Sequence, residues 1–476
     1  MSSFYPFWTN ATVAHESQQH HFPCCFPQAS IHINDIFCTD HAAKEHDMKG
    51  DDAWETIILS NYMIDFEWLC QAVPALAMVQ KQLIVLSGEK GTATVRVVES
   101  SAGSGDGSCT KVTRYSPVPE SQDNHNGMIW AAIAGGIPHE KIVILEPPLP
   151  YLYGTHHSKF VLAINKHGIR VVICTANFIH DDWVNKTQGI YIQDFPFKSN
   201  VLSPEGGGDS NMGAPCLPVD DYQLRKGEDF RLYLQLYLGQ VGLLPLPRGN
   251  KSRQIVSFSP QDLDAFDFCS AKVWLFGSVP GSHRGQRLMS FGINRLFSVL
   301  RNVSLSTEAA LTNTTNPNDT QPVILSWQYS SQGSLNDKFL KAMQRCMTAP
   351  DVFVADLQVI YPSEDEVRCS LEGWRGGLSL PVRLRCCDPF INARLHRWGS
   401  SGDSLSSASE LWRYALPHIK SYAALDRARR SIVWFALTSA NLSQAAWGVG
   451  GGGRRGARPT RERFPLYPLL RAGGAL

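Results

Sequence analysis

The sequence predicts an α/β protein made of two similar domains, each with a mixed, mostly parallel sheet flanked by helices and with the active site at their interface. Three observations favour this fold. The chain has 476 residues, which is too long for one ordinary domain. Short apolar runs of strand length alternate with helical stretches, as in layered α/β proteins. One motif occurs twice, once in each half of the chain.

The first half of the chain supplies four of the predicted strands. Ile57–Tyr62 and Gln82–Ser87 are apolar and rich in branched residues, and Phe66–Gln71 between them has the pattern of a short helix. Lys141–Leu145 and Arg170–Cys174 are strand-length runs that are mostly apolar. Such runs are typical of central strands that helices cover on both faces.

Three more candidates lie beyond residue 270. Ser431–Leu437 is an apolar run of the same covered kind, and Lys272–Phe276 and Phe353–Ile360 are further strand candidates. Four segments rich in Gly, Ser, Thr, Asn or Asp are expected to be surface loops, namely residues 99–126, 203–217, 306–320 and 399–409.

These elements divide the chain into four parts. Residues 1–30 belong to a stretch at 1–55 that is rich in His, Asp and Pro, and they are expected to be poorly ordered. Residues 31–279 form the predicted N-terminal domain and residues 280–448 the C-terminal domain, with the join in a turn-rich stretch. Residues 449–476 are a tail rich in Gly and Arg.

Composition limits the classes of function. The formal net charge of +1 excludes a polycation, although a local basic groove stays compatible with it. The twelve cysteines form no CxxC motif, so we expect free thiols in a reducing compartment rather than a zinc ribbon or a redox motif. Neither a signal peptide nor a membrane span is recognisable, so we expect a soluble intracellular protein.

The duplicated motif is HxK, an apolar strand, and a turn of small residues that ends in Asn. The first copy has HSK at 157–159 and Asn177, and the second has HIK at 418–420 and Asn441. A third HxK at 139–141 lacks the strand and the Asn, and we interpret it as a surface pair. A single HxK is weak, but the whole unit in duplicate indicates one site built by two halves.

The residue types in this unit suit phosphodiester chemistry. Residues two apart in a strand share a face, so each His and its Lys point to the same side. Two facing units would offer two imidazoles, two ammonium groups and two amides to the oxygens of a pentacovalent phosphorus. One imidazole can attack phosphorus, while the other, with an ordinary pKa near ~6.5, can transfer the proton. Without a carboxylate cluster for Mg²⁺, we expect neither a metal nor a cofactor.

These units resemble the phospholipase D superfamily, whose usual members carry HxKxxxxD. Here Ile164 and Leu425 stand where that aspartate would be, and its absence from both copies resembles the tyrosyl-DNA phosphodiesterase family. The resemblance covers roughly residues 30–448. The matching words are YGTHHSKF (153–160), RVVICTANFIHDDWVNKTQGI (170–190), GSVPG (277–281), SSQGSL (330–335), YPS (361–363), SLEGW (370–374), GGLSLP (376–381), LPHIKSY (416–422) and LTSANLSQAAWG (437–448).

The resemblance implies an activity and its partners. The reaction would be hydrolysis of the 3′-phosphotyrosyl bond between DNA and a topoisomerase I tyrosine, through a phosphohistidine, leaving a 3′-phosphate. The setting would be DNA repair in the nucleus. The partners would be single-stranded or nicked DNA with 3′ adducts and the tyrosyl peptide left by the topoisomerase, with no membrane involved and a monomeric protein.

The resemblance also assigns catalytic roles. His157 would be the nucleophile, and His418 the general acid and then the general base. Gln188 would orient His157. Four residues would hold the phosphoryl oxygens: Lys159, Lys420, Asn177 and Asn441. We interpret His156 as a packed neighbour rather than as the nucleophile.

DNA contacts form a second group of implied roles. Tyr153 would stack on a base beside the pocket, with residence in the core as the alternative. The predicted contacts to the DNA backbone are Ser331, Ser334, Ser443 and Arg397. The alternative for each serine is a structural role in a turn, and the alternative for the arginine is a solvated surface position.

The C-terminal end departs from the family pattern. The family has a glutamate on a final strand that supports the acid/base histidine, but residues 449–476 contain no strand-like run. Glu462 stands at about the right distance with neighbours that do not match, so we assign it no role. We interpret the tail as a non-native end, with an Arg/Gly nucleic-acid arm as the alternative. If the final strands are missing, His418 would lose its orienting partner.

Two rival functions follow. One is another phospholipase D-type enzyme that acts on phospholipid or on nucleic acid generally. The other is a catalytically impaired protein that binds DNA ends.

Overall fold

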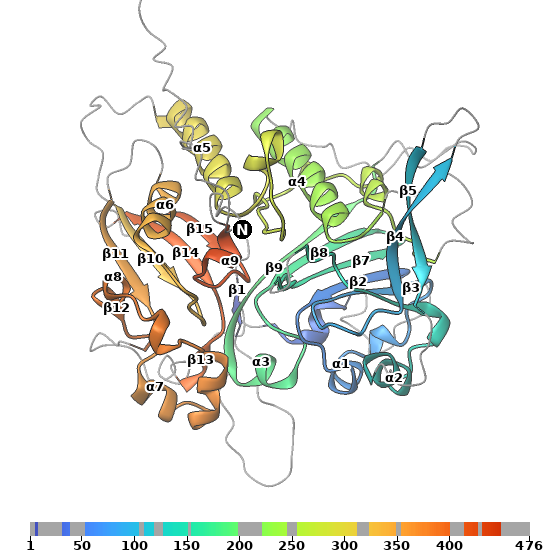
Figure 1. Cartoon of the computed structure of the whole chain (residues 1–476), viewed down its shortest axis with the longest axis horizontal. Helices are drawn as coiled ribbons and strands as arrows, with labels where there is room; N and C mark the ends of the chain where they lie inside the picture. The colour runs from blue at the N-terminus through green and yellow to red at the C-terminus, as the bar shows by residue number, and fades with distance from the viewer. Residues whose placement is uncertain are drawn as a thin grey trace, which may run out of the picture.

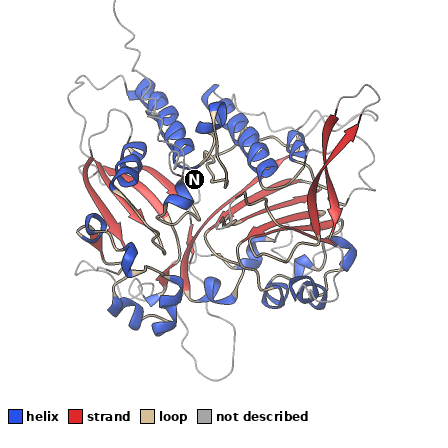
Figure 2. Ribbon diagram, in the orientation of Figure 1, coloured by secondary structure: helices blue, strands red, loops and turns tan. Residues whose placement is uncertain are grey.

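Two mixed sheets, one from each half of the chain, lie side by side in the computed structural model (Figure 1). Helices flank both sheets (Figure 2). The structure describes residues 5–7, 31–38, 53–103, 109–118, 127–150, 154–198, 221–244, 255–311, 323–348, 354–399, 414–426 and 431–448. An α/β fold with two such sheets was the prediction from the sequence.

The first sheet follows the strand order β1-β9-β8-β7-β2-β3-β6-β4-β5. Strands β2, β3 and β6 are parallel neighbours, and β7, β8 and β9 continue the sheet antiparallel from β2. The bounds are β1 Tyr5–Phe7, β2 Thr56–Asn61, β3 Gln82–Ser87, β4 Val95–Gly103, β5 Cys109–Pro117, β6 Ile142–Leu145, β7 Phe160–Asn165, β8 Gly168–Cys174 and β9 Lys186–Pro196.

The second sheet follows the order β12-β11-β10-β14-β15. Strands β10, β11 and β12 are parallel, and β14 and β15 run antiparallel from β10. The bounds are β10 Val323–Gln328, β11 Val354–Ile360, β12 Leu395–His396, β14 Ser421–Asp426 and β15 Ser431–Leu437.

The two sheets repeat one topology. The run β8-β7-β2-β3-β6 of the first sheet matches β15-β14-β10-β11-β12 of the second, both in order and in strand direction. The duplicated motif therefore marks duplicated architecture. The prediction that the sheets are mostly parallel was wrong, because the strand after each HxK pairs antiparallel with the next one and antiparallel pairs are at least as frequent among the described strands.

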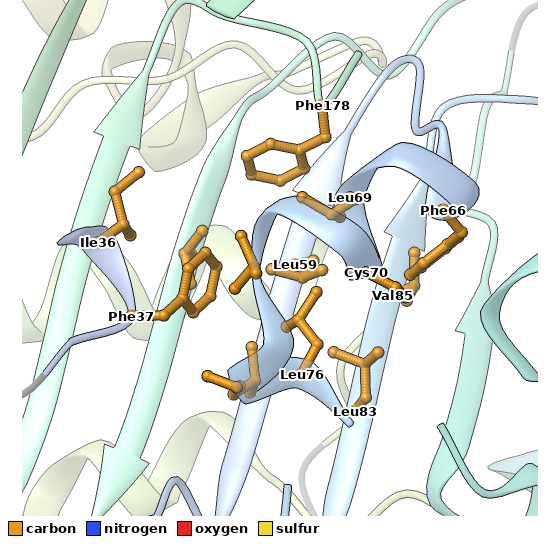
Figure 3. Close-up of a cluster of buried hydrophobic side chains, with 14 of the residues drawn as sticks. Ile36, Phe37, Leu59, Phe66, Leu69, Cys70, Leu76, Leu83, Val85 and Phe178 are labelled. Carbon is orange, nitrogen blue, oxygen red and sulfur yellow. The ribbon is translucent and has the colours of Figure 1, made fainter. Parts of the chain in front are cut away.

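The helices pack their apolar faces on the sheets. Helix α1 begins after Asp65, whose side chain accepts a hydrogen bond from Trp68 N at 3.1 Å and so caps the helix. In Figure 3 its Leu69 lies over Leu59 of β2, and its Phe66 lies beside Val85 of β3. The helix bounds are α1 Phe66–Ala72, α2 Gly127–Ala134, α3 His180–Val184, α4 Asp221–Gln240, α5 Gly292–Leu311, α6 Asp337–Met347, α7 Glu364–Arg368, α8 Pro389–Asn392 and α9 Gln444–Trp447.

Most predicted strands are confirmed within one or two residues, but Lys272–Phe276 forms none. Side chains form hydrogen bonds with the backbone of this segment in place of a neighbouring strand. Lys272 N donates to Gln193 Oε1 at 3.1 Å, and Leu275 O accepts from Arg295 Nε at 3.0 Å. Parts of the segments expected to be loops are also regular, since β4 and β5 form a hairpin and α5 continues to Leu311. Residues 203–217 and 449–476 lie outside the described part of the chain.

The strand Ser431–Leu437 is correctly located but not covered as expected. β15 is at the edge of its sheet, and Ile432 is 61% exposed. Apolar content alone cannot distinguish a covered strand from an uncovered one. In the described residues, no helix combines the length and the apolar character that a bilayer crossing needs.

Candidate active site

The two halves are joined by a short strand next to the second HxK unit. Strand β13, Leu416–Pro417, pairs parallel with Lys186–Thr187 of β9 in the first sheet. His418 N and Ile419 N both donate to Thr187 O at 2.9 Å. The second half thereby places His418 against the first sheet.

A glycine allows this close contact. A side chain at Gly189 of β9 would clash with Ile419 and Leu437 of the second half. The segment KTQGI therefore contributes to the interface in two ways. Gly189 leaves room for the second half, and the neighbouring Gln188 faces the site.

Each HxK unit lies immediately before its strand rather than within it. Lys159 O accepts from Cys174 N at 3.0 Å, and Lys420 O accepts from Thr438 N at 3.1 Å. These bonds extend the two hairpins back to the lysines. Lys159 and Lys420 are both buried, and each ammonium also donates to the backbone oxygen of the histidine two residues before it.

His157 is held by the opposite half. Its Nδ1 lies 3.1 Å from Ser439 O, in the turn after β15. Because a carbonyl oxygen only accepts, Nδ1 carries the hydrogen, and the Nε2 of the neutral ring keeps its lone pair. Lys159 Nζ lies 3.3 Å from Nε2, and the ring of Tyr62 lies 5.3 Å from the imidazole, centroid to centroid.

His418 has different neighbours. Its Nδ1 is 3.3 Å from Asp182 Oδ2 and 3.3 Å from Gln188 Oε1. Gln188 is fixed in turn, since its Nε2 donates to Asp182 O at 2.9 Å and its Oε1 accepts from Thr175 Oγ1 at 2.8 Å. His418 therefore has a carboxylate and an amide of the first half beside it, while residues 449–476, the segment of the predicted departure from the family pattern, lie outside the described part of the chain.

Gln188 was expected to orient His157, and the structure places it against His418 instead. The reason is the pairing of β9 with β13, which brings the side chain of β9 to the histidine that follows β13. Asp182 was not singled out from the sequence. The signal that could have found it is the acidic pair in IHDDW, directly after the first Asn turn.

The two asparagines are fixed differently. Asn177 N and Nδ2 both donate to Asp182 Oδ2, at 2.7 and 2.8 Å, and its Oδ1 is buried without a hydrogen-bond partner among the described residues. Asn441 Oδ1 instead accepts from Ser330 N at 3.1 Å and from Ser331 N at 3.0 Å. Asn177 is thus linked through Asp182 to His418 of the second unit, whereas Asn441 is held by the backbone that follows β10.

The electrostatics favour an anion in this site. Burial lowers the pKa of Lys159 to about 8, and it holds the pKa of Lys420 well below its ordinary value. Burial and the neighbouring ammonium groups also lower the pKa values of His157 and His418 well below 6.5. Both rings are therefore neutral when the site holds no anion. A bound phosphodiester would offset the repulsion between the ammonium groups and a protonated ring.

His156 is the packed neighbour that the sequence suggested. Its Nε2 lies 2.7 Å from Ser60 Oγ, and burial lowers its pKa to about 3. The ring of His157, by contrast, contacts Ser439 O of the second half, and His157 is the less buried of the two adjacent histidines. Among the described residues, no group of His, Cys, Asp and Glu is arranged to hold a metal ion.

The predicted DNA contacts are distributed around the second sheet. Ser331 adjoins Asn441, while Ser443 caps α9 by accepting from Ala446 N at 3.1 Å. Ser334 Oγ lies 3.8 Å from Cys386 Sγ. Arg397 is exposed directly after β12, three strands from β14, or roughly 14 Å at ordinary strand spacing. Tyr153 lies outside the described residues.

Comparison with known proteins yields consistent matches. The family model for tyrosyl-DNA phosphodiesterase matches residues 30–456. Tyrosyl-DNA phosphodiesterase 1 of Arabidopsis thaliana is 32% identical over 399 residues, which are 82% of this chain and 53% of that protein. Its namesake in Drosophila melanogaster is 31% identical over 327 residues, covering 65% of this chain and 48% of that protein. The chain thus spans about half the length of these curated relatives.

The fold matches a solved structure. The crystal structure of the yeast tyrosyl-DNA phosphodiesterase superposes with a TM-score of 0.54 at 14% identity, covering 94% of this chain and 87% of that one. At this identity the likeness concerns the fold alone.

Proposed function

Because the chain belongs to the tyrosyl-DNA phosphodiesterase family, we propose that it hydrolyses the phosphodiester bond between a DNA 3′ end and a tyrosine, leaving a 3′-phosphate. The observation that carries this proposal is the meeting of two imidazole–ammonium pairs from separate halves. His157 bonds to Ser439 O of the second half, and His418 is anchored to Thr187 of the first. A phosphodiester between them would contact both rings.

The first step forms the phosphohistidine. The lone pair on His157 Nε2 attacks phosphorus, and the bond from phosphorus to the tyrosyl oxygen breaks. The leaving oxygen takes a proton from His418. A displacement on phosphorus by a ring nitrogen is thereby coupled to protonation of the leaving group.

The second step releases the product. His418, now neutral, removes a proton from water, and the water oxygen attacks phosphorus as the bond to His157 Nε2 breaks. The 3′-phosphate leaves, and both histidines return to their starting states. No metal is needed in this scheme, since Lys159 and Lys420 supply the positive charge for the phosphoryl oxygens.

The contacts of the two rings support this division of labour. A carbonyl at Nδ1 leaves His157 with a lone pair for attack, whereas the carboxylate of Asp182 stabilises the imidazolium form of His418. An anion bound between the lysines would raise the pKa of His418 from its lowered value, because it offsets their charge. The acid is then charged when the substrate is present.

We further propose that the substrates are 3′ adducts on single-stranded or nicked DNA, including the tyrosyl peptide of a topoisomerase I, and that the protein works in DNA repair in the nucleus. Tyr62, 37% exposed and beside the ring of His157, would form an aromatic wall of the pocket. The contacts of His418 with Asp182 and Gln188 favour an active enzyme over the rival of an impaired DNA-end binder, because both side chains can orient the ring.

The test is turnover of an oligonucleotide with a 3′-phosphotyrosine in the presence of EDTA. We expect release of tyrosine and a 3′-phosphate, and no hydrolysis of phosphatidylcholine vesicles by the same preparation. Binding of the oligonucleotide without turnover would favour the impaired binder, and turnover of the lipid would favour the general phospholipase D-type enzyme.

A further inference from the structure

A chain of buried charges leads away from His418. Asp182 Oδ2 lies 3.3 Å from His418 Nδ1, and Asp182 Oδ1 lies 3.4 Å from Lys186 Nζ. The same Lys186 Nζ donates to Glu372 Oε1 at 3.0 Å. The side chains of Asp182, Lys186 and Glu372 are all almost wholly removed from solvent.

Both halves of the protein contribute to this chain. Asp182 lies in α3, Lys186 opens β9, and Glu372 comes from the second half, directly before the 3₁₀ helix Gly373–Ser379. In that helix, a side chain at Gly376 would clash with Leu416 of β13. Glu372 therefore belongs to a segment packed on the strand that leads into His418.

The burial of the Glu372 carboxylate costs folding free energy, which is unexpected for a purely structural residue. Its Oε2 is buried and has no hydrogen-bond partner among the described residues. Burial also raises the pKa of its carboxyl, against the lowering effect of Lys186. Burying an ion pair usually stabilises a fold little or not at all, so such a carboxylate calls for another explanation.

We propose that Glu372 and Lys186 are positioning residues that act through Asp182 to set the proton affinity of His418. This inference rests on the proposed function, because it concerns the residue that we assign as general acid and base. Neither residue touches the rings of the two histidines in any contact of the described residues, so neither is itself catalytic.

The charges around His418 make its proton affinity sensitive to Glu372. Asp182 favours a proton on the ring, whereas Lys420, Lys159 and Lys186 disfavour it. His157 lies near the same ammonium groups, and a charge on His418 lowers its pKa. Glu372 faces Lys186, with Asp181 and Asp182 near it. When Glu372 is ionised, its negative charge balances the positive charge of Lys186. The negative charge of Asp182 then acts mainly on His418.

Glu372→Gln removes this balance while keeping the shape of the side chain. Lys186 would then draw on Asp182 alone, and the proton affinity of His418 would fall. We expect the basic limb of the kcat–pH profile on the 3′-phosphotyrosyl oligonucleotide to move to lower pH by about 0.5–1 unit, with little change in KM. Glu372→Gln combined with Lys186→Met removes both charges and should move the limb back toward that of the unmodified protein.

The matched control is Arg375→Gln. Arg375 lies 3.9 Å from Asp181 in another contact between the halves, but it is 84% exposed, so its loss should leave the limb in place. If Glu372→Gln does not fold, Glu372→Asp carries the test, because it withdraws the carboxylate from Lys186 by one methylene and should give a smaller shift in the same direction.

The outcomes separate the two proposals. An unmodified protein without turnover contradicts the proposed function. Turnover whose basic limb stays fixed in the Glu372 variants, or a double variant displaced as far as Glu372→Gln, overturns the inference alone. A structural role would lower kcat in every variant without moving the limb.

Discussion

The two halves share a strand topology, but the neighbours of their HxK units differ. In the first half β9 pairs with the outer side of β8, and α3 and β9 supply Asp182 and Gln188 to the site. In the second half no strand pairs with the outer side of β15 in the part of the chain that the structure describes. Along that strand Ile432 and Val433 are exposed.

The consequence is chemical. The side chains around β9 reach across to His418, which gains a carboxylate, whereas His157 meets a backbone carbonyl from the other half. Two copies of one motif thus become two imidazoles with different neighbours, which supports the different tasks that we propose for them. The difference comes from which strand lies beside each copy, not from the motif itself.

The sharpest way to break this asymmetry is Asp182→Asn. It keeps an acceptor for Asn177 but removes the charge that stabilises the imidazolium of His418. We expect kcat to fall by about 10²–10³-fold, the size of a lost general acid–base contribution. Steady-state kinetics on the 3′-phosphotyrosyl oligonucleotide measure this, and a loss below about threefold would mean that Asp182 has only a structural role.

A second prediction concerns the lysines. Burial lowers the pKa of Lys159 to about 8, so folding at pH 7 works against an unfavourable buried charge. Lys159→Met should abolish turnover and raise the free energy of unfolding at pH 7 by on the order of 2–3 kcal/mol. The sign is set by a folded pKa below the unfolded value of 10.5, so the gain should be complete below pH 8 and vanish above about pH 10.5.

Denaturant unfolding at pH 7 and at pH 10.5 checks the second prediction. Lys420→Met is the matched variant in the other half, with the same expected direction. A variant that unfolds more easily than the unmodified protein at pH 7 would show that the bonds of the ammonium outweigh the burial of its charge.

A third prediction uses the residue before each histidine that we propose as catalytic, which is His156 in the first half and Pro417 in the second. His156 has a folded pKa of about 3, below the unfolded value of 6.5, so its neutral form stabilises the fold at pH 7. That contribution should be lost as the pH falls below 6.5, by roughly 1–2 kcal/mol at pH 5. His156→Gln should flatten this part of the stability–pH curve, and an unchanged slope would contradict the assignment.

The smallest expected effect is on the uncovered edge. Ile432→Lys on β15 should change the free energy of unfolding by less than about 1 kcal/mol and should reduce aggregation, because the side chain is exposed. Val172→Lys on β8, the covered counterpart, should prevent folding, since that side chain is fully buried. Equal effects of the two substitutions would mean that β15 is covered in solution.

Local patterns predicted much of this fold. Gln82–Ser87 and Ser431–Leu437 are strands with the predicted bounds, because β-branched apolar runs of that length leave few alternatives. The HxK units were found for a similar reason, since each is a short word followed by its own hairpin. Family membership is established, while the roles of individual site residues stay predictions.

What the sequence did not predict depends on contacts between the halves. Gln188 and Asp182 lie more than 200 positions from His418, and only the pairing of β13 with β9 brings them together. The exposure of Ile432 likewise depends on which strand lies beside β15. Composition and periodicity describe a segment, and they carry no information about its neighbour across a domain interface.

The central claim is that two histidines from separate halves divide one displacement on phosphorus. It is tested most directly by trapping the intermediate on the 3′-phosphotyrosyl oligonucleotide. In His418→Asn we expect a covalent DNA adduct to accumulate and to map by mass spectrometry to His157, and in His157→Ala we expect none. An adduct on any other residue, or turnover that continues without both histidines, would contradict the account.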